Sequence, residues 1–87
     1  MKIILNKDII TYEEHEEIIF INMQKNNMFT LDHIGTLIWN HLKENNNVEA
    51  VANYISQLYE ENAEIIKLDI LNLIDQLRDA GVIKVNV

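Results

Sequence analysis

The sequence of 87 residues contains no cysteine and no proline, and it has only two glycines. Without cysteine the chain has no disulfide framework and no thiolate ligands for zinc or an iron–sulfur cluster, which suits a reducing compartment. Basic residues are also scarce, with seven against fourteen acidic ones, and they are scattered singly along the chain. Because nucleic-acid binders cluster Lys and Arg to neutralise phosphates, we expect no nucleic-acid partner.

Long apolar segments are missing as well. No stretch approaches the roughly 18 apolar residues of a membrane span, and the apolar run at the N-terminus lacks the length and the small-residue cleavage site of a signal peptide. We therefore expect a cytoplasmic protein without membrane contact. The length suits one hydrophobic core, so the sequence predicts a single domain over residues 1–87.

The first part of the chain, up to about Leu31, has the pattern of strands. Short apolar runs are separated by polar clusters whose lengths suit antiparallel hairpins, in which asparagine tolerates positive φ angles. The segment Val82–Val87 alternates apolar and polar residues, and we expect it to pair with Lys2–Leu5. The predicted strands of the first part are Ile3–Leu5, Ile9–Tyr12, Ile18–Asn22 and Met28–Leu31.

The remainder of the chain has helical periodicity, which predicts helices over about residues 32–44, 48–60 and 64–80. Asp32 suits the N-cap of the first helix, and Gly81 suits the positive φ that follows the last one. The apolar residues expected on the inner faces are Ile34, Leu37, Ile38, Trp39 and Leu42 in the first helix, and Val51, Ala52, Ile55, Leu58 and Tyr59 in the second.

The third helix carries more apolar residues than one core-facing stripe needs. Leu68 and Leu71 both fall outside that stripe. Because a helix of so small a domain is hard to bury on all sides, we expect these two residues to form a second apolar face that meets a ligand. The stripe itself is complete with Ile66, Ile70, Leu73, Ile74 and Leu77.

No catalytic or metal-binding pattern is convincing. His33 and His41 are eight residues apart, about 12 Å along a helix and about 80° around it, so they cannot share one metal ion. His15 lies among four glutamates, where an exposed charged turn is the better explanation and a cation site the weaker one. We therefore expect no enzymatic activity, no cofactor and no metal.

The segment Met28–Trp39 resembles the hallmark of PqqD-like domains. In that family a strand ending in aromatic-x-Leu is followed by a capping Asn or Asp, a glycine in the first helical turn and an aliphatic-Trp pair. The likeness continues through Val48–Ala52 and the third helix, and it covers about Asp8 to Ile83. It departs from the family at Asp32, where asparagine is commoner, and at Asn45–Asn47, where relatives place Asp-Gly and where we expect a looser turn.

This resemblance implies an α+β fold, a three-stranded antiparallel sheet packed on three helices, similar to a winged helix-turn-helix. It also implies a recognition element for the leader segment of a ribosomally synthesised precursor peptide, of a lasso-peptide or radical-SAM peptide pathway. The implied partners are that peptide and a modifying enzyme such as a radical-SAM protein, a cyclase or a leader peptidase. A winged-helix nucleic-acid-binding or regulatory interaction module is the alternative.

In the family the leader adds as a strand to a sheet edge and lies against the third helix. An exposed edge strand can also pair with a second copy of the chain, so a homodimer is an alternative use of the same edge. The resemblance places the peptide at the edge residues Asn27, Met28, Phe29, Thr30 and Leu31 and at the helix residues Lys67, Leu68, Leu71, Ile74, Asp75 and Arg78.

Overall fold

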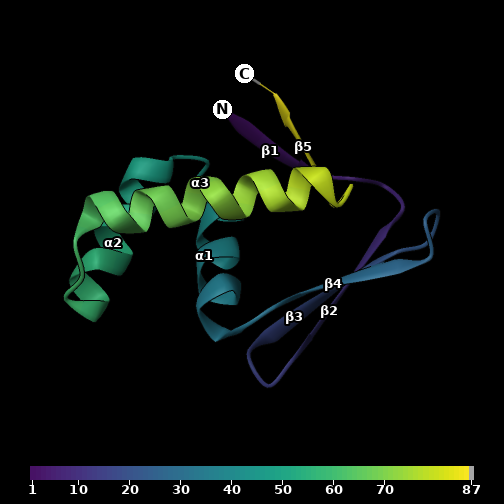
Figure 1. Cartoon of the computed structure of the whole chain (residues 1–87), viewed down its shortest axis with the longest axis horizontal. Helices are drawn as coiled ribbons and strands as arrows, with labels where there is room; N and C mark the ends of the chain where they lie inside the picture. The colour runs from purple at the N-terminus through teal and green to yellow at the C-terminus, as the bar shows by residue number, and fades with distance from the viewer. Residues whose placement is uncertain (87) are drawn as a thin grey trace.

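A computed structural model describes residues 1–86 of the chain (Figure 1). Val87, the last residue of the predicted terminal strand and domain, lies outside the described residues. The helices begin and end within one residue of the predicted ranges, and the strands of the first part extend the predicted runs by one or two residues. The elements are β1 (Lys2–Leu5), β2 (Ile9–Glu14), β3 (Glu17–Asn22), β4 (Asn27–Leu31), α1 (His33–Glu44), α2 (Val48–Tyr59), α3 (Ala63–Asp79) and β5 (Ile83–Asn86).

Strands β2, β3 and β4 form an antiparallel sheet in that order. The turn between β2 and β3 has two residues, His15 and Glu16, both with positive φ, which is the backbone of a tight type I′ hairpin. The turn between β3 and β4 ends at Asn26, which also has positive φ, and Asn22 Oδ1 accepts hydrogen bonds from two backbone N–H groups inside it. The predicted fold class, an antiparallel sheet with three helices, is confirmed.

One face of this sheet contributes to the core. Ile18 and Phe20 of β3 and Leu31 of β4 are buried, and the ring of Phe20 meets Trp39 of α1 edge to face at a centroid distance of 5.2 Å. Trp39 therefore has the core position that its helical spacing predicted. An edge-to-face aromatic pair contributes roughly 0.5–1.5 kcal/mol beyond the area that it buries.

The junction between β4 and α1 is built from side-chain hydrogen bonds. The Asp32 carboxylate accepts from the Gly35 N–H at 2.7 Å, as an N-cap does, which confirms the predicted cap. One turn later the buried Thr36 hydroxyl accepts from the backbone N–H of Ile18 at 3.0 Å and donates to the Leu31 carbonyl at 3.4 Å. Thr36 thus joins α1 to both β3 and β4.

Helix α3 ends with Gly81 in a positive-φ conformation, as predicted from the sequence. Gly81 has φ of 77°, its N–H bonds to the Arg78 carbonyl, and the Val82 N–H bonds back to the Leu77 carbonyl. These two bonds define a Schellman motif, and the buried side chains of Val82 and Leu77 supply its usual apolar contact. The motif turns the chain directly into β5.

The predicted pairing of the chain ends is confirmed over the described residues. Strands β1 and β5 are antiparallel, with Lys2 opposite Asn86 and Leu5 opposite Ile83, and they form a separate two-stranded sheet. The ribbon lies on the far side of α3 from the three-stranded sheet in Figure 1. It is also tied to the helices, because the Ile3 N–H donates to Asn46 Oδ1 at 2.8 Å.

That last bond corrects the expectation of a looser turn at Asn45–Asn47. Asn46 holds β1, and the Asn47 side chain caps α2 by accepting from the Ala50 N–H at 3.0 Å. Two of the three asparagine side chains therefore fix this connection.

Three predicted core residues are exposed instead: Ile34, Leu58 and Tyr59. Ile34 lies in the first turn of α1, and the other two lie in the last turn of α2. The buried stretches of these helices begin at Thr36 and end at Ile55, so both helices extend past the core at these ends. Helical periodicity identifies the inner side of a helix but not where the neighbouring elements stop covering it.

We expect Thr36→Val to lower the free energy of unfolding by about 1–3 kcal/mol, because the buried Ile18 N–H loses its acceptor while the side-chain volume is kept. Thr36→Ser is the matched control, since it keeps the hydroxyl and removes only a methyl group. Urea denaturation followed by circular dichroism measures both. Equal stability losses in the two variants would contradict the assigned bridge.

Candidate functional site

Titratable side chains do not gather into a reactive cluster in the described part of the chain. No group of three or more His, Asp or Glu residues lies close enough to hold a metal ion among residues 1–86. His15 of the β2–β3 turn lies 3.6 Å from the Glu14 carboxylate, and His33, the first residue of α1, lies 3.0 Å from the carboxylate of Glu16 in that turn. His41 lies against the ring of Tyr54. No helix of residues 1–86 is long and apolar enough to cross a membrane.

The free edge of β4 is the first part of the predicted site. Within the described residues β4 pairs with β3 only. Because the two-residue turn makes Glu14 and Glu17 a hydrogen-bonded pair, alternation along the ladders directs the backbone of Phe29 toward β3 and that of Met28 and Thr30 outward. Two residues of β4 thus present unpaired N–H and C=O groups at the edge.

Side chains of β4 alternate between its two faces from Met28 onward. Leu31 is buried and Phe29 packs against the core, whereas Met28 is 68% exposed and Thr30 is also exposed. Asn27, at the start of the strand, is exposed as well. The strand is therefore anchored through alternate residues while its edge stays accessible. The other edge of the sheet, β2, carries Glu13 and Glu14, and charged residues discourage strand addition.

The outer side of α3 is the second part. Leu68 is 62% exposed and Leu71 is 39% exposed, which confirms that both lie outside the core stripe. Ile65 was not among the predicted residues, but it is exposed three residues before Leu68 and extends the apolar surface by one turn. Its i, i+3 spacing from Leu68 was the available signal.

The other predicted residues of α3 divide into three kinds. Ile74 is only 4% exposed and belongs to the core with Ile70 and Leu77, so it is not accessible to a peptide, contrary to the prediction. Lys67 is half-buried. Asp75 and Arg78 are exposed and form an ion pair at 2.6 Å one turn apart. Figure 1 shows β4 and the C-terminal half of α3 on the same side of α1, with β4 below α3.

Comparison with protein-family models matches residues 17–83 to the family described as "Coenzyme PQQ synthesis protein D (PqqD)". The chain belongs to the PqqD family. The resemblance predicted over Asp8 to Ile83 is thus confirmed from Glu17 onward, and the matched span contains every residue of the predicted site. No curated protein sequence matches this PqqD-family chain.

Two solved structures share the fold over their whole length. One is TbiB1 in complex with the TbiA(beta) leader peptide, with 20% identity, a TM-score of 0.84, and coverage of 100% of this chain and 99% of TbiB1. The other is a lasso peptide synthetase B1 complexed with the leader peptide, with 18% identity, a TM-score of 0.90, and coverage of 98% and 100%.

Truncation of the two neighbouring apolar positions in α3 distinguishes surface from core. We expect Ile74→Ala to lower the free energy of unfolding by about 2–5 kcal/mol, because it opens a cavity in the core. Leu71→Ala removes partly exposed surface, so its cost is expected to stay near about 1 kcal/mol or below. Thermal or urea denaturation measures both, and equal losses would show that the two side chains are not separated in this way.

Proposed function

We propose that this PqqD-family chain binds the leader segment of a ribosomally synthesised precursor peptide and delivers it to a modifying enzyme. The leader adds as a strand to the edge of β4 and lays apolar side chains against Leu68 and Leu71. The observation that carries the proposal is the full-length likeness to two proteins that were each solved with a leader peptide. The chain itself supplies no chemistry in this role and acts as a binding module.

The β4 edge suits a partner that is read mainly through its backbone. Outward N–H and C=O groups at Met28 and Thr30 accept a strand of almost any sequence, with each added hydrogen bond contributing roughly 0.5–1.5 kcal/mol. The exposed leucines of α3 add selectivity, since each apolar side chain buried there contributes roughly 1.5–3 kcal/mol. Ordering a flexible leader opposes binding by about 2–5 kcal/mol. The balance favours affinities from micromolar to nanomolar.

The partner enzyme belongs to the pathway that makes the peptide. A lasso-peptide pathway is favoured, since one of the two similar structures is a lasso peptide synthetase B1, and a leader peptidase or a cyclase then receives the bound peptide. A radical-SAM enzyme is the partner in the other pathway that the family resemblance implies. Nucleic-acid binding is disfavoured, because the chain has a formal charge of −7.

Fluorescence polarisation with a labelled leader, taken from a precursor peptide encoded beside this protein, measures binding. We expect Leu71→Glu to abolish binding at tens of micromolar while the fold stays intact, because the charge would be desolvated under the peptide. Leu58→Glu is the matched control: Leu58 is an exposed leucine on α2, away from β4. Loss of binding in both variants, or in neither, would contradict the assignment to α3.

The strand-addition step has its own test at Met28. Met28→Pro removes one outward N–H from an edge position, where proline is tolerated, and we expect the leader to bind about two- to tenfold more weakly. Met28→Ala is the control, because it removes the side chain and keeps the N–H. Equal weakening in the two variants would mean that the side chain, rather than the backbone edge, makes the contact.

A further inference from the structure

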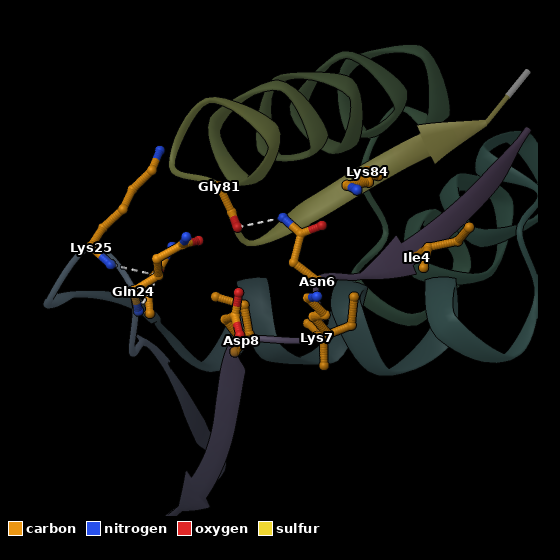
Figure 2. Close-up of a pocket in the computed structure, with 11 residues that line it drawn as sticks. Ile4, Asn6, Lys7, Asp8, Gln24, Lys25, Gly81 and Lys84 are labelled. Carbon is orange, nitrogen blue, oxygen red and sulfur yellow. Dashed lines mark hydrogen bonds between the residues drawn. The ribbon is translucent and has the colours of Figure 1, made fainter.

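A cavity of about 770 Å³ lies where the β1–β5 ribbon, the β1–β2 linker and the β3–β4 turn meet (Figure 2). Its volume falls in the range of small-ligand sites, about 300–1,000 Å³. The residues that line it come from both ends of the chain and from the sheet: Ile4 and Asn6 from the first segment, Lys25 from the turn, and Gly81 and Lys84 from the last segment. None of them belongs to the proposed leader-binding surface.

Positive charge is concentrated at this cavity. Lys7, Lys25 and Lys84 line it, and Asp8 is the one acidic residue in the lining, so the local formal charge is +2. The whole chain has seven basic residues and a formal charge of −7. Three of the seven cations therefore surround one cavity in an otherwise acidic molecule, which is a setting that attracts an anion.

Two nitrogen donors lie close together beside Gly81, one of the residues that line this cavity. A Cβ atom on Gly81 would lie 3.2 Å from Lys25 Nζ and 3.3 Å from Asn22 Nδ2, so both nitrogens face the same small space. Asn22 is 6% exposed, and its Oδ1 already accepts from the backbone N–H groups of Gln24 and Lys25. Its Nδ2 has no acceptor among the described residues. Asn6 differs, because its Nδ2 donates to the Gly81 carbonyl.

Part of the cavity lining is apolar. Ile4 and Leu5 line it and are partly exposed, and Ile9 also belongs to the lining. A small inorganic anion would leave this surface uncovered. The combination of two free donors, three lysines and an apolar wall suits a ligand in which a carboxylate is carried next to an apolar group.

We propose that this cavity binds a carboxylate that neighbours an apolar side chain, as in a peptide where an acidic residue adjoins an apolar one. Gln24 and Lys25 of the cavity wall precede Asn27, the first residue of β4, by three and two residues. A peptide that leaves the β4 edge at this end reaches the cavity within a few residues. The proposed carboxylate site does not depend on leader binding. Only the suggestion that the leader supplies the carboxylate rests on the proposed function.

Two synthetic dipeptides test the site without the leader. Acetyl-Leu-Glu-amide and acetyl-Leu-Gln-amide differ only in the end of the second side chain, which is a carboxylate in one and an amide in the other. NMR titration of the ¹⁵N-labelled protein measures the binding of each peptide. We expect the Glu peptide to shift the side-chain amide of Asn22 and the backbone amides of Lys25 and Gly81, with much weaker shifts from the Gln peptide. Equal shifts from both peptides, or none at these three residues, would overturn the proposal.

A pair of charge variants separates a built site from general attraction. We expect Lys25→Gln to weaken binding of the Glu dipeptide by about two- to fivefold, the contribution of one partly exposed ion pair. Lys43→Gln removes the same charge from an exposed position on α1 and should change binding little. Equal weakening by both variants would mean that the dipeptide responds only to net charge.

Two further titrations distinguish a free small carboxylate from an acidic residue of the leader as the ligand. Acetate that saturates the same amides as readily as the Glu dipeptide would identify a free small carboxylate as the ligand. A leader peptide whose acidic residues are changed to Gln or Asn should still perturb β4 and Leu71 but no longer Lys25 and Gly81, if the leader is the source. If no leader binds while the Glu dipeptide does, the proposed function fails and the carboxylate site stands.

Discussion

The arrangement of the whole molecule depends on how the three-stranded sheet is joined to α1. The Thr36 hydroxyl links the helix to β3 and β4 through the Ile18 N–H and the Leu31 carbonyl, and the Phe20 ring packs on Trp39 beside it. Only one face of the sheet meets this junction. These few buried contacts set the angle at which β4 enters α1, and therefore the position of β4 relative to α3.

A core this small has consequences for the surface. Strand β4 is held by Leu31 and Phe29, and the residues that alternate with them, Met28 and Thr30, are left with free backbone groups and exposed side chains. Helix α3 is held by Ile70, Ile74 and Leu77, and its outer leucines remain uncovered. The same alternation that stabilises each element thus leaves an unpaired strand edge, to which an extended peptide can add, and an apolar helix face, which can contact apolar side chains of such a peptide.

Much of this architecture could be predicted because residues that are close together in the sequence determine it. Asp32 and Gly81 mark the ends of α1 and α3 through capping geometry, and the surplus of Leu68 and Leu71 follows from helical spacing alone. Ile34 and Leu58 were predicted wrongly because spacing does not tell where a neighbouring element ends. Ile74 was predicted to be a site residue from the family resemblance, although its helical spacing had already predicted a core position. The spacing was right, because Ile74 is buried.

The cavity that we propose binds a carboxylate could not be predicted from the sequence, because Lys7, Lys25 and Lys84 are far apart in the chain. Pairing of β1 with β5 and the Schellman turn at Gly81 bring them together. The scattered lysines were taken as evidence against a nucleic-acid site, but residues that are scattered in the sequence can still gather in space. The asparagines at Asn46 and Asn47 are a similar case, because their bonds reach β1 and α2 and depend on the finished fold.

Amide hydrogen exchange with and without a saturating leader peptide tests the central claim most directly, because it reports on the backbone edge itself. If the leader adds to β4, the amides of Met28 and Thr30, which point away from β3, exchange more slowly in the complex. The outward amides of β2 should be unaffected. Unchanged exchange at Met28 and Thr30, with protection at β2 or elsewhere instead, would contradict strand addition at β4.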